Sequence, residues 1–139
     1  MTARTALTPI VLGQDGSVAL GSGTSIAGLV SGGAYVADPP GPNKVFLLVD
    51  NTYSAAENVT VRAGGNGTTA SGGTNPGVPF DSAPVGDLVV SCTNGAYTLI
   101  GPFTSDRYTQ ADGSLSIDFA SALTGTIWVI QNPENGIWG

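Results

Sequence analysis

The chain has 139 residues and a net charge of −6, because four Lys and Arg stand against ten Asp and Glu. This length fits one domain, which can bury about two-thirds of its unfolded surface. An acidic chain is a poor match for phosphate backbones and anionic membrane surfaces, so we expect neither nucleic acid nor a membrane as a partner. With 21 Gly and 9 Pro, and only 10% charged residues, the composition favours an all-β domain with many turns.

The chain contains no His and one Cys. Their scarcity excludes Ser-His-Asp and Cys-His mechanisms and the usual Cys/His zinc sites. The ten acidic residues are scattered, and several occupy turn positions, where Asp bonds its own backbone. We therefore expect no enzyme, no cofactor and no metal site. Cys92, in phase with Leu88 and Val90, is expected to be a small buried core residue.

The first third of the chain has little hydrophobic periodicity. Residues 1–15 are expected to form an N-terminal arm with a first short strand at 10–12, and residues 16–43 form a Gly-, Ser- and Pro-rich extended segment along the edge of the fold. The N-terminus lacks the apolar run of a secretory signal peptide, and no run approaches the length of a membrane helix. We expect the chain to be made in a cytoplasm.

The stretch 44–63 contains the strongest strand signals. Residues 44–51 contain the continuous apolar run Val-Phe-Leu-Leu-Val, which is rich in β-branched and aromatic side chains and typical of a strand buried on both faces. Residues 58–63 alternate between apolar and polar, which predicts one dry and one wet face. The six residues between them fit the loop of an antiparallel hairpin, and we expect this pair at the centre of a sheet.

A long Gly-rich loop at 64–77 follows, without the Lys and helix start of a phosphate-binding loop. Strands are then expected on both sides of Asn94-Gly95, whose two residues tolerate positive φ and predict a hairpin. A second hairpin is expected around residues 111–113. The expected strands cover residues 87–93, 96–100, 107–110, 114–119 and 126–131.

Strands at roughly ten-residue spacing, separated by turn signals, predict an all-β fold. We expect a single antiparallel β-sandwich, of jelly-roll or Ig-like kind, with an extended N-terminal arm and a C-terminal tail. Residues 44–131 would form the sandwich core and residues 132–139 the tail.

Seven residues are candidates for contact with a partner. They lie on the arm, in the tail, or on the second face of the central strand: Arg4, Leu7, Pro9, Phe46, Leu48, Ile137 and Trp138. The tail pair either docks onto a partner or packs back on its own chain. Phe46 and Leu48 either lie beneath loops of the same chain or contact a neighbouring subunit. If the arm serves a partner, deletion of residues 1–9 weakens partner binding and leaves the monomer folded.

Several segments, taken in order, resemble the head decoration, or cement, proteins of tailed phages of actinobacteria. They are residues 3–9, 45–51, 59–64, 100–103 and 112–119. The resemblance implies a virion structural protein on the outside of the capsid. It would bind the major capsid protein, form a homotrimer and stabilise contacts between capsomers.

Two other functions are compatible with the residues. A tail or fibre adhesion module would bind host-surface glycans through exposed aromatic rings, for which Tyr53, Tyr97 and Trp128 are candidates. A tail-tube subunit would instead assemble with itself into rings and tubes.

Overall fold

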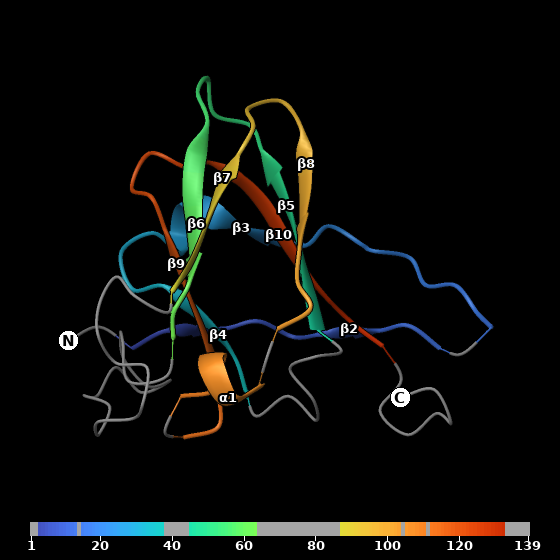
Figure 1. The fold of residues 1–139 in the computed structure, drawn as a ribbon. Helices are drawn as coiled ribbons and strands as arrows, with labels where there is room; N and C mark the ends of the chain where they lie inside the picture. The colour runs from blue at the N-terminus through green and yellow to red at the C-terminus, as the bar shows by residue number, and fades with distance from the viewer. Residues whose placement is uncertain are drawn as a thin grey trace.

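The computed structural model describes residues 3–13, 15–37, 45–63, 87–103, 105–110 and 112–132. Within these ranges ten strands and two short helical turns confirm the expected all-β fold (Figure 1). The strands are β1 (Thr5–Ala6), β2 (Ile10–Val11), β3 (Thr24–Ser25), β4 (Ala34–Val36), β5 (Val45–Asn51), β6 (Glu57–Val61), β7 (Leu88–Cys92), β8 (Tyr97–Ile100), β9 (Leu115–Phe119) and β10 (Gly125–Gln131). The helical turns are η1 (Ile26–Gly28) and α1 (Ser105–Tyr108).

The strands form two sheets. The first, called here the β6 sheet, has the order β1-β4-β9-β6-β7. The second, the β5 sheet, has the order β2-β10-β5-β8, and β3 also pairs with β10. Most neighbours are antiparallel, but β1 runs parallel to β4 and β2 runs parallel to β10. The sheets are therefore mixed, and the prediction of purely antiparallel pairing is wrong at the arm strands.

The hairpin predicted from residues 44–63 does not form, because β5 and β6 belong to different sheets. β5 lies between β10 and β8, and β6 lies between β9 and β7, so each strand is interior to its own sheet. The buried amide of Asn51 holds the crossing turn, since its Nδ2 donates to the carbonyls of Ala55 and Cys92 at 3.1 and 2.8 Å. A polar residue at the end of an apolar strand thus stabilises the turn that leads from the β5 sheet to the β6 sheet.

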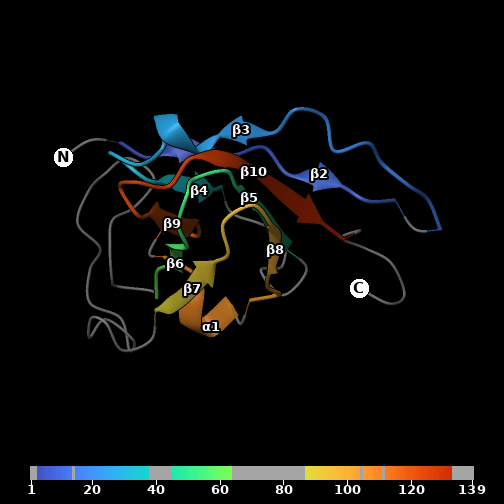
Figure 2. The same cartoon turned by 90° about the horizontal axis from the view of Figure 1, so that it is seen from above.

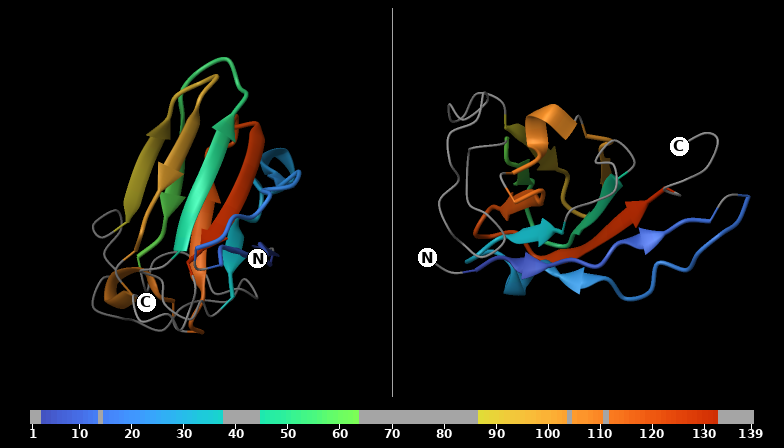
Figure 3. Two further views of the ribbon diagram at one scale, coloured as in Figure 1. Left: turned by 90° about the vertical axis from the view of Figure 1, so that its right-hand side faces the viewer. Right: turned by 90° about the horizontal axis from the view of Figure 1, so that it is seen from below.

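The Asn94-Gly95 turn also crosses between the sheets instead of closing a hairpin. Gly95 has a φ of 73° and donates its N–H to the carbonyl of Asn51 at 2.8 Å. The turn is thus bonded to the end of β5, and β7 and β8 form the last strands of their two sheets. Both lie along the same margin of the molecule (Figure 3, left).

The second predicted hairpin is present only in part. β9 forms as expected, but residues 105–108 adopt the turn of helix α1 in place of a strand, and a single bridge joins Thr109 to Leu115. The last predicted strand is confirmed as β10.

One hydrophobic cluster takes side chains from both sheets. The alternation predicted for residues 58–63 is confirmed, because Val59, Val61 and Ala63 are fully buried. β5 differs from its prediction: Val45, Leu47 and Val49 are buried, whereas the residues between them are only half-buried. β5 therefore has one buried face, and its other face remains partly open.

The first third of the chain is built into both sheets. The arm contributes β1 to the β6 sheet and β2 to the β5 sheet. It therefore forms the edge of each sheet that lies farthest from β7 or β8. Figures 2 and 3 (right) show β2 and β3 alongside β10. Residues 16–37 are not merely extended edge chain, because they contain β3, η1 and β4, and β4 lies between β1 and β9.

Candidate functional site

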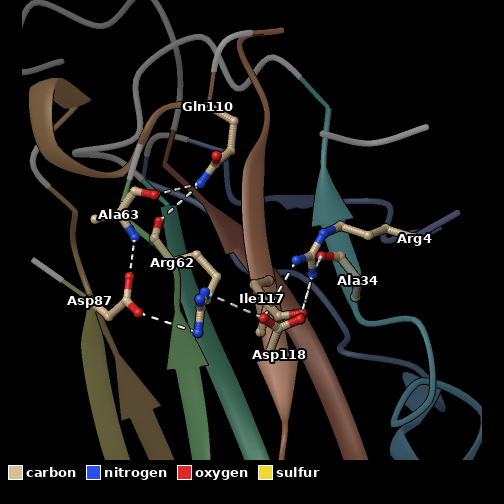
Figure 4. A network of polar contacts seen from close by, with 8 residues as sticks. All are labelled: Arg4, Ala34, Arg62, Ala63, Asp87, Gln110, Ile117 and Asp118. Atoms are coloured by element: carbon tan, nitrogen blue, oxygen red, sulfur yellow. Dashed lines mark hydrogen bonds and ion pairs between the residues drawn. The ribbon is translucent and has the colours of Figure 1, made fainter. Parts of the chain in front are cut away.

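Arg4 is held inside its own chain. Its Nη1 lies 2.6 Å from Oδ1 of Asp118 and donates to the carbonyl of Ile117 at 3.0 Å (Figure 4). The Arg4 side chain is 3% exposed. A guanidinium so buried is stable only when paired and hydrogen-bonded, and β9 supplies both kinds of partner. Arg4 therefore anchors the arm to the β6 sheet.

The ion pair belongs to a wider polar network. Arg62 lies between two carboxylates, with Nε 3.5 Å from Oδ2 of Asp118 and Nη1 3.3 Å from Oδ2 of Asp87. Asp87 also accepts the N–H of Ala63 at 2.7 Å, and Gln110 donates to the carbonyls of Arg62 and Ala63. The network joins the arm, β9, the end of β6 and the start of β7 (Figure 4).

Leu7 completes the anchoring of the arm. It belongs to the buried hydrophobic cluster, and its N–H donates to the carbonyl of Tyr35 at 2.9 Å. Pro9 is half-buried. Arg4 and Leu7, proposed from sequence as partner contacts, therefore face their own chain in this structure. The prediction that a monomer without residues 1–9 stays folded is not tested by the structure. Because deletion would open the core and leave Asp118 without its closest cation, we now expect it to lower the stability of the monomer.

Ile137 and Trp138, the candidates in the tail, lie outside the described residues, as does the Gly-rich loop at 64–77.

The other two candidates, Phe46 and Leu48, belong to an apolar surface on the outer side of the β5 sheet. In the sheet register Leu48 lies opposite both Trp128 and Leu99, and Phe46 lies opposite Ile130. Directly opposed residues point to the same face of a sheet, so these side chains are neighbours. We call this surface the apolar face; it consists of Phe46, Leu48, Tyr97, Leu99, Trp128 and Ile130.

The exposure of the apolar face rises toward β8. Tyr97 and Leu99 are 64% and 60% exposed, whereas Phe46, Leu48, Trp128 and Ile130 are half-buried. Asp50 is the only charged residue in β5, β8 and β10. The sequence pointed to Phe46 and Leu48 but missed Leu99 and Ile130, although the alternation within residues 97–100 and 125–131 carried the signal.

Two aromatic rings are fixed on this face. The rings of Tyr97 and Trp128 lie 6.1 Å apart between centroids with a tilt of 30°, and Trp128 Nε1 donates to the carbonyl of Gly21 at 3.2 Å. A Cβ at Gly23 would overlap the Trp128 indole and the Thr126 methyl group. The turn at residues 21–23 can therefore lie against the indole only with glycine at position 23, and this contact orients the ring.

The described residues contain no group of three or more His, Cys, Asp or Glu side chains that could hold a metal ion. Among them there is also no helix with the length and hydropathy needed to cross a membrane. Burial raises the pKa of the Cys92 thiol above its ordinary value of 9.0, and a hydrogen bond with Thr98 opposes this shift. The expectation that Cys92 is a buried core residue is confirmed.

No protein-family model matches the chain, and neither a curated protein nor a solved structure matches it.

Proposed function

We propose that this chain is a virion structural protein, a head decoration or cement protein of a tailed phage. It binds the outside of the capsid and stabilises contacts between capsomers of the major capsid protein. Several segments of the chain, taken in sequence order, resemble decoration proteins, and this resemblance supports the proposal. So does an all-β fold whose open surface is apolar and nearly free of charge.

The finer architecture is part of the same proposal. The two sheets would be the layers of one β-sandwich, of jelly-roll or Ig-like kind. Its support is the single hydrophobic cluster to which both sheets contribute. The anchored arm would stiffen the end of this body opposite β7 and β8, since it contributes one strand to each sheet.

The observation that carries the proposal is the apolar face. Contiguous exposed apolar surface marks protein interaction sites, and Trp and Tyr are enriched among the residues that dominate binding energy. Because β5, β8 and β10 together carry only one carboxylate, removing water from this surface costs little free energy. Phe46 and Leu48 would contact the capsid or a neighbouring subunit in a homotrimer, and Ile137 and Trp138 remain candidates for the same role.

Cement action follows from mass action. A protein that binds only the assembled shell shifts the equilibrium toward that shell, and many copies add their contributions. The chain would be synthesised in the host cytoplasm and would function on the capsid exterior.

Co-sedimentation with heads of the phage that encodes the chain tests the proposal. Wild type and Val89→Ser should sediment with the heads, because Val89 is exposed on β7, outside the apolar face. Phe46→Ser and Ile130→Thr should bind at least about tenfold more weakly, with circular dichroism confirming the fold. A wild-type protein that stays in the supernatant would reject the decoration function. Normal binding by both variants would reject the apolar face as the contact.

A second candidate is supported by the Tyr97–Trp128 pair. Sugar-binding sites present aromatic faces to the apolar side of a sugar ring, and this pair is held on an open sheet surface. An adhesion module for host-surface glycans would then use these two rings. A glycan array tests this candidate: the wild type should bind at least one glycan, and Tyr97→Ala should lower that signal. Absence of any wild-type signal, or a signal that Tyr97→Ala leaves unchanged, would reject it.

A further inference from the structure

The strand β8 has one unpaired edge in the described part of the chain. β8 pairs with β5 on one side, and no described strand pairs with it on the other. An end strand of this kind presents a row of N–H and C=O groups on which another strand can pair. Figure 3 (left) shows β8 beside β7, the outermost strand on that side of the view.

β8 lacks the usual protection of a sheet edge. Proteins protect end strands by making them very short or by placing Lys, other charges or Pro on them. At the opposite ends of the sheets, β1 and β2 have two residues each and are protected by their shortness. β8 has four residues, Tyr-Thr-Leu-Ile, and no residue between 88 and 105 is charged.

β8 also carries the two most exposed large apolar side chains in the described ranges. Tyr97 and Leu99, at 64% and 60% exposure, exceed every other large hydrophobic residue in the described ranges. Both point to the same face of β8, whose second edge is open in the described part of the chain. Because β8 combines unpaired backbone groups with exposed apolar side chains, the partner that fits it is another β-strand.

We propose that β8 pairs with β8 of a second copy of this chain, antiparallel across a two-fold axis. Pairing centred on Thr98 places Tyr97 of each copy opposite Leu99 of the other. This arrangement keeps both apolar faces on one side and forms two identical aromatic–aliphatic pairs.

The charge of the chain limits where a second copy can bind. Each copy carries a net charge of −6, so two copies repel at most surfaces. β8 brings no charged side chain to the contact, so it is a place where like charges do not oppose each other. Higher salt should therefore strengthen the pairing, because it screens the long-range repulsion.

This inference goes beyond the proposed function, because the pairing needs no capsid. It also differs from the homotrimer that the resemblance implies. The mass of the isolated protein therefore tests it separately from binding to heads.

Sedimentation equilibrium of the full chain should give the mass of two chains, with an association that tightens between about 20 and 150 mM salt. Leu99→Lys should weaken dimerisation at least about tenfold, because it places two ammonium groups in the paired strands. Val89→Lys on β7, where Val89 is 52% exposed, should remain dimeric. A wild-type mass of one or three chains, or a dimer that Leu99→Lys leaves unchanged, would overturn the proposal.

Disulfide trapping tests the register independently of any loss of folding in the Lys variants. A mixture of Tyr97→Cys and Leu99→Cys proteins should oxidise to a cross-linked dimer, whereas each protein alone should cross-link at least about tenfold more slowly. The buried Cys92 thiol should not interfere. Equal cross-linking in all three samples, or none in the mixture, would overturn the pairing through β8.

Discussion

Arg4 and Asp118 lie 114 positions apart in the chain, yet their Nη1 and Oδ1 atoms are separated by 2.6 Å. The contact joins the N-terminal arm to β9, a strand near the middle of the β6 sheet. Asp118 is also paired with Arg62, so the arm enters a network that already links β6 and β9. Arg4 is therefore part of the folded body.

Replacement of Arg4 by Ala should destabilise the protein by about 2 kcal/mol, the typical value for a lost hydrogen bond to a charged group. The variant removes the donor to Asp118 and to the carbonyl of Ile117, which is also buried. Urea unfolding followed by circular dichroism measures the change. Arg107→Ala, which removes an equal charge from an exposed side chain, should unfold at nearly the wild-type midpoint. Equal midpoints for the two variants would contradict the anchoring of the arm.

Gly33→Ala should lower stability by about 1–3 kcal/mol. Gly33 has a φ of 77°, and a Cβ there would overlap Nη1 of Arg4 and Oδ1 of Asp118. The substitution both strains the backbone and displaces the ion pair. Gly28→Ala is the matched control, because no atom lies within 4 Å of its added Cβ. Thermal unfolding should show a lower Tm for Gly33→Ala only, and similar Tm values would contradict the close packing.

Asn51→Asp should cost about 3 kcal/mol, because a charged carboxylate would face two carbonyl oxygens in a buried site. In the wild type, Nδ2 donates to Ala55 and Cys92, and Oδ1 accepts the N–H of Tyr53 at 2.8 Å. The control Asn58→Asp makes the same chemical change on an exposed side chain. Urea unfolding at pH 7 should separate the two variants. If Asn51→Asp is as stable as Asn58→Asp, the amide does not hold the crossing turn.

Cys92 should react slowly with thiol reagents while the protein is folded. Burial raises the pKa of its thiol above 9.0, so at pH 8 a smaller fraction is thiolate than in the unfolded chain. Labelling with a chromogenic disulfide should be at least about a hundredfold slower than in denaturing urea. The rate should rise as the pH increases toward the raised pKa. Native labelling as fast as labelling in urea would show that the thiol is accessible.

The sequence was sufficient to predict most of the strands and the buried face of β6. Val59, Val61 and Ala63 are buried as the alternation predicted, and residues 126–131 fall in β10. These features depend on local periodicity, which is visible in one short window.

The pairing of the strands could not be predicted from local signals. Asn94-Gly95 is the strongest hairpin signal in the chain, yet Gly95 bonds to Asn51 and the turn crosses between sheets. The turn residues specify the local reversal of the chain and do not specify which sheet receives the next strand. The apolar face was found only in part for the same reason, since Leu48 and Leu99 meet through a pairing between distant strands.

The anchored arm has a consequence for how the chain is made. Asp118 is translated 114 positions after Arg4, and Gln131, whose carbonyl accepts the N–H of Leu12, is translated later still. At a translation rate of roughly 5–20 residues per second, the residues that the arm contacts are synthesised on the order of ten seconds after it. The arm can thus complete its docking only after residue 131 has been synthesised.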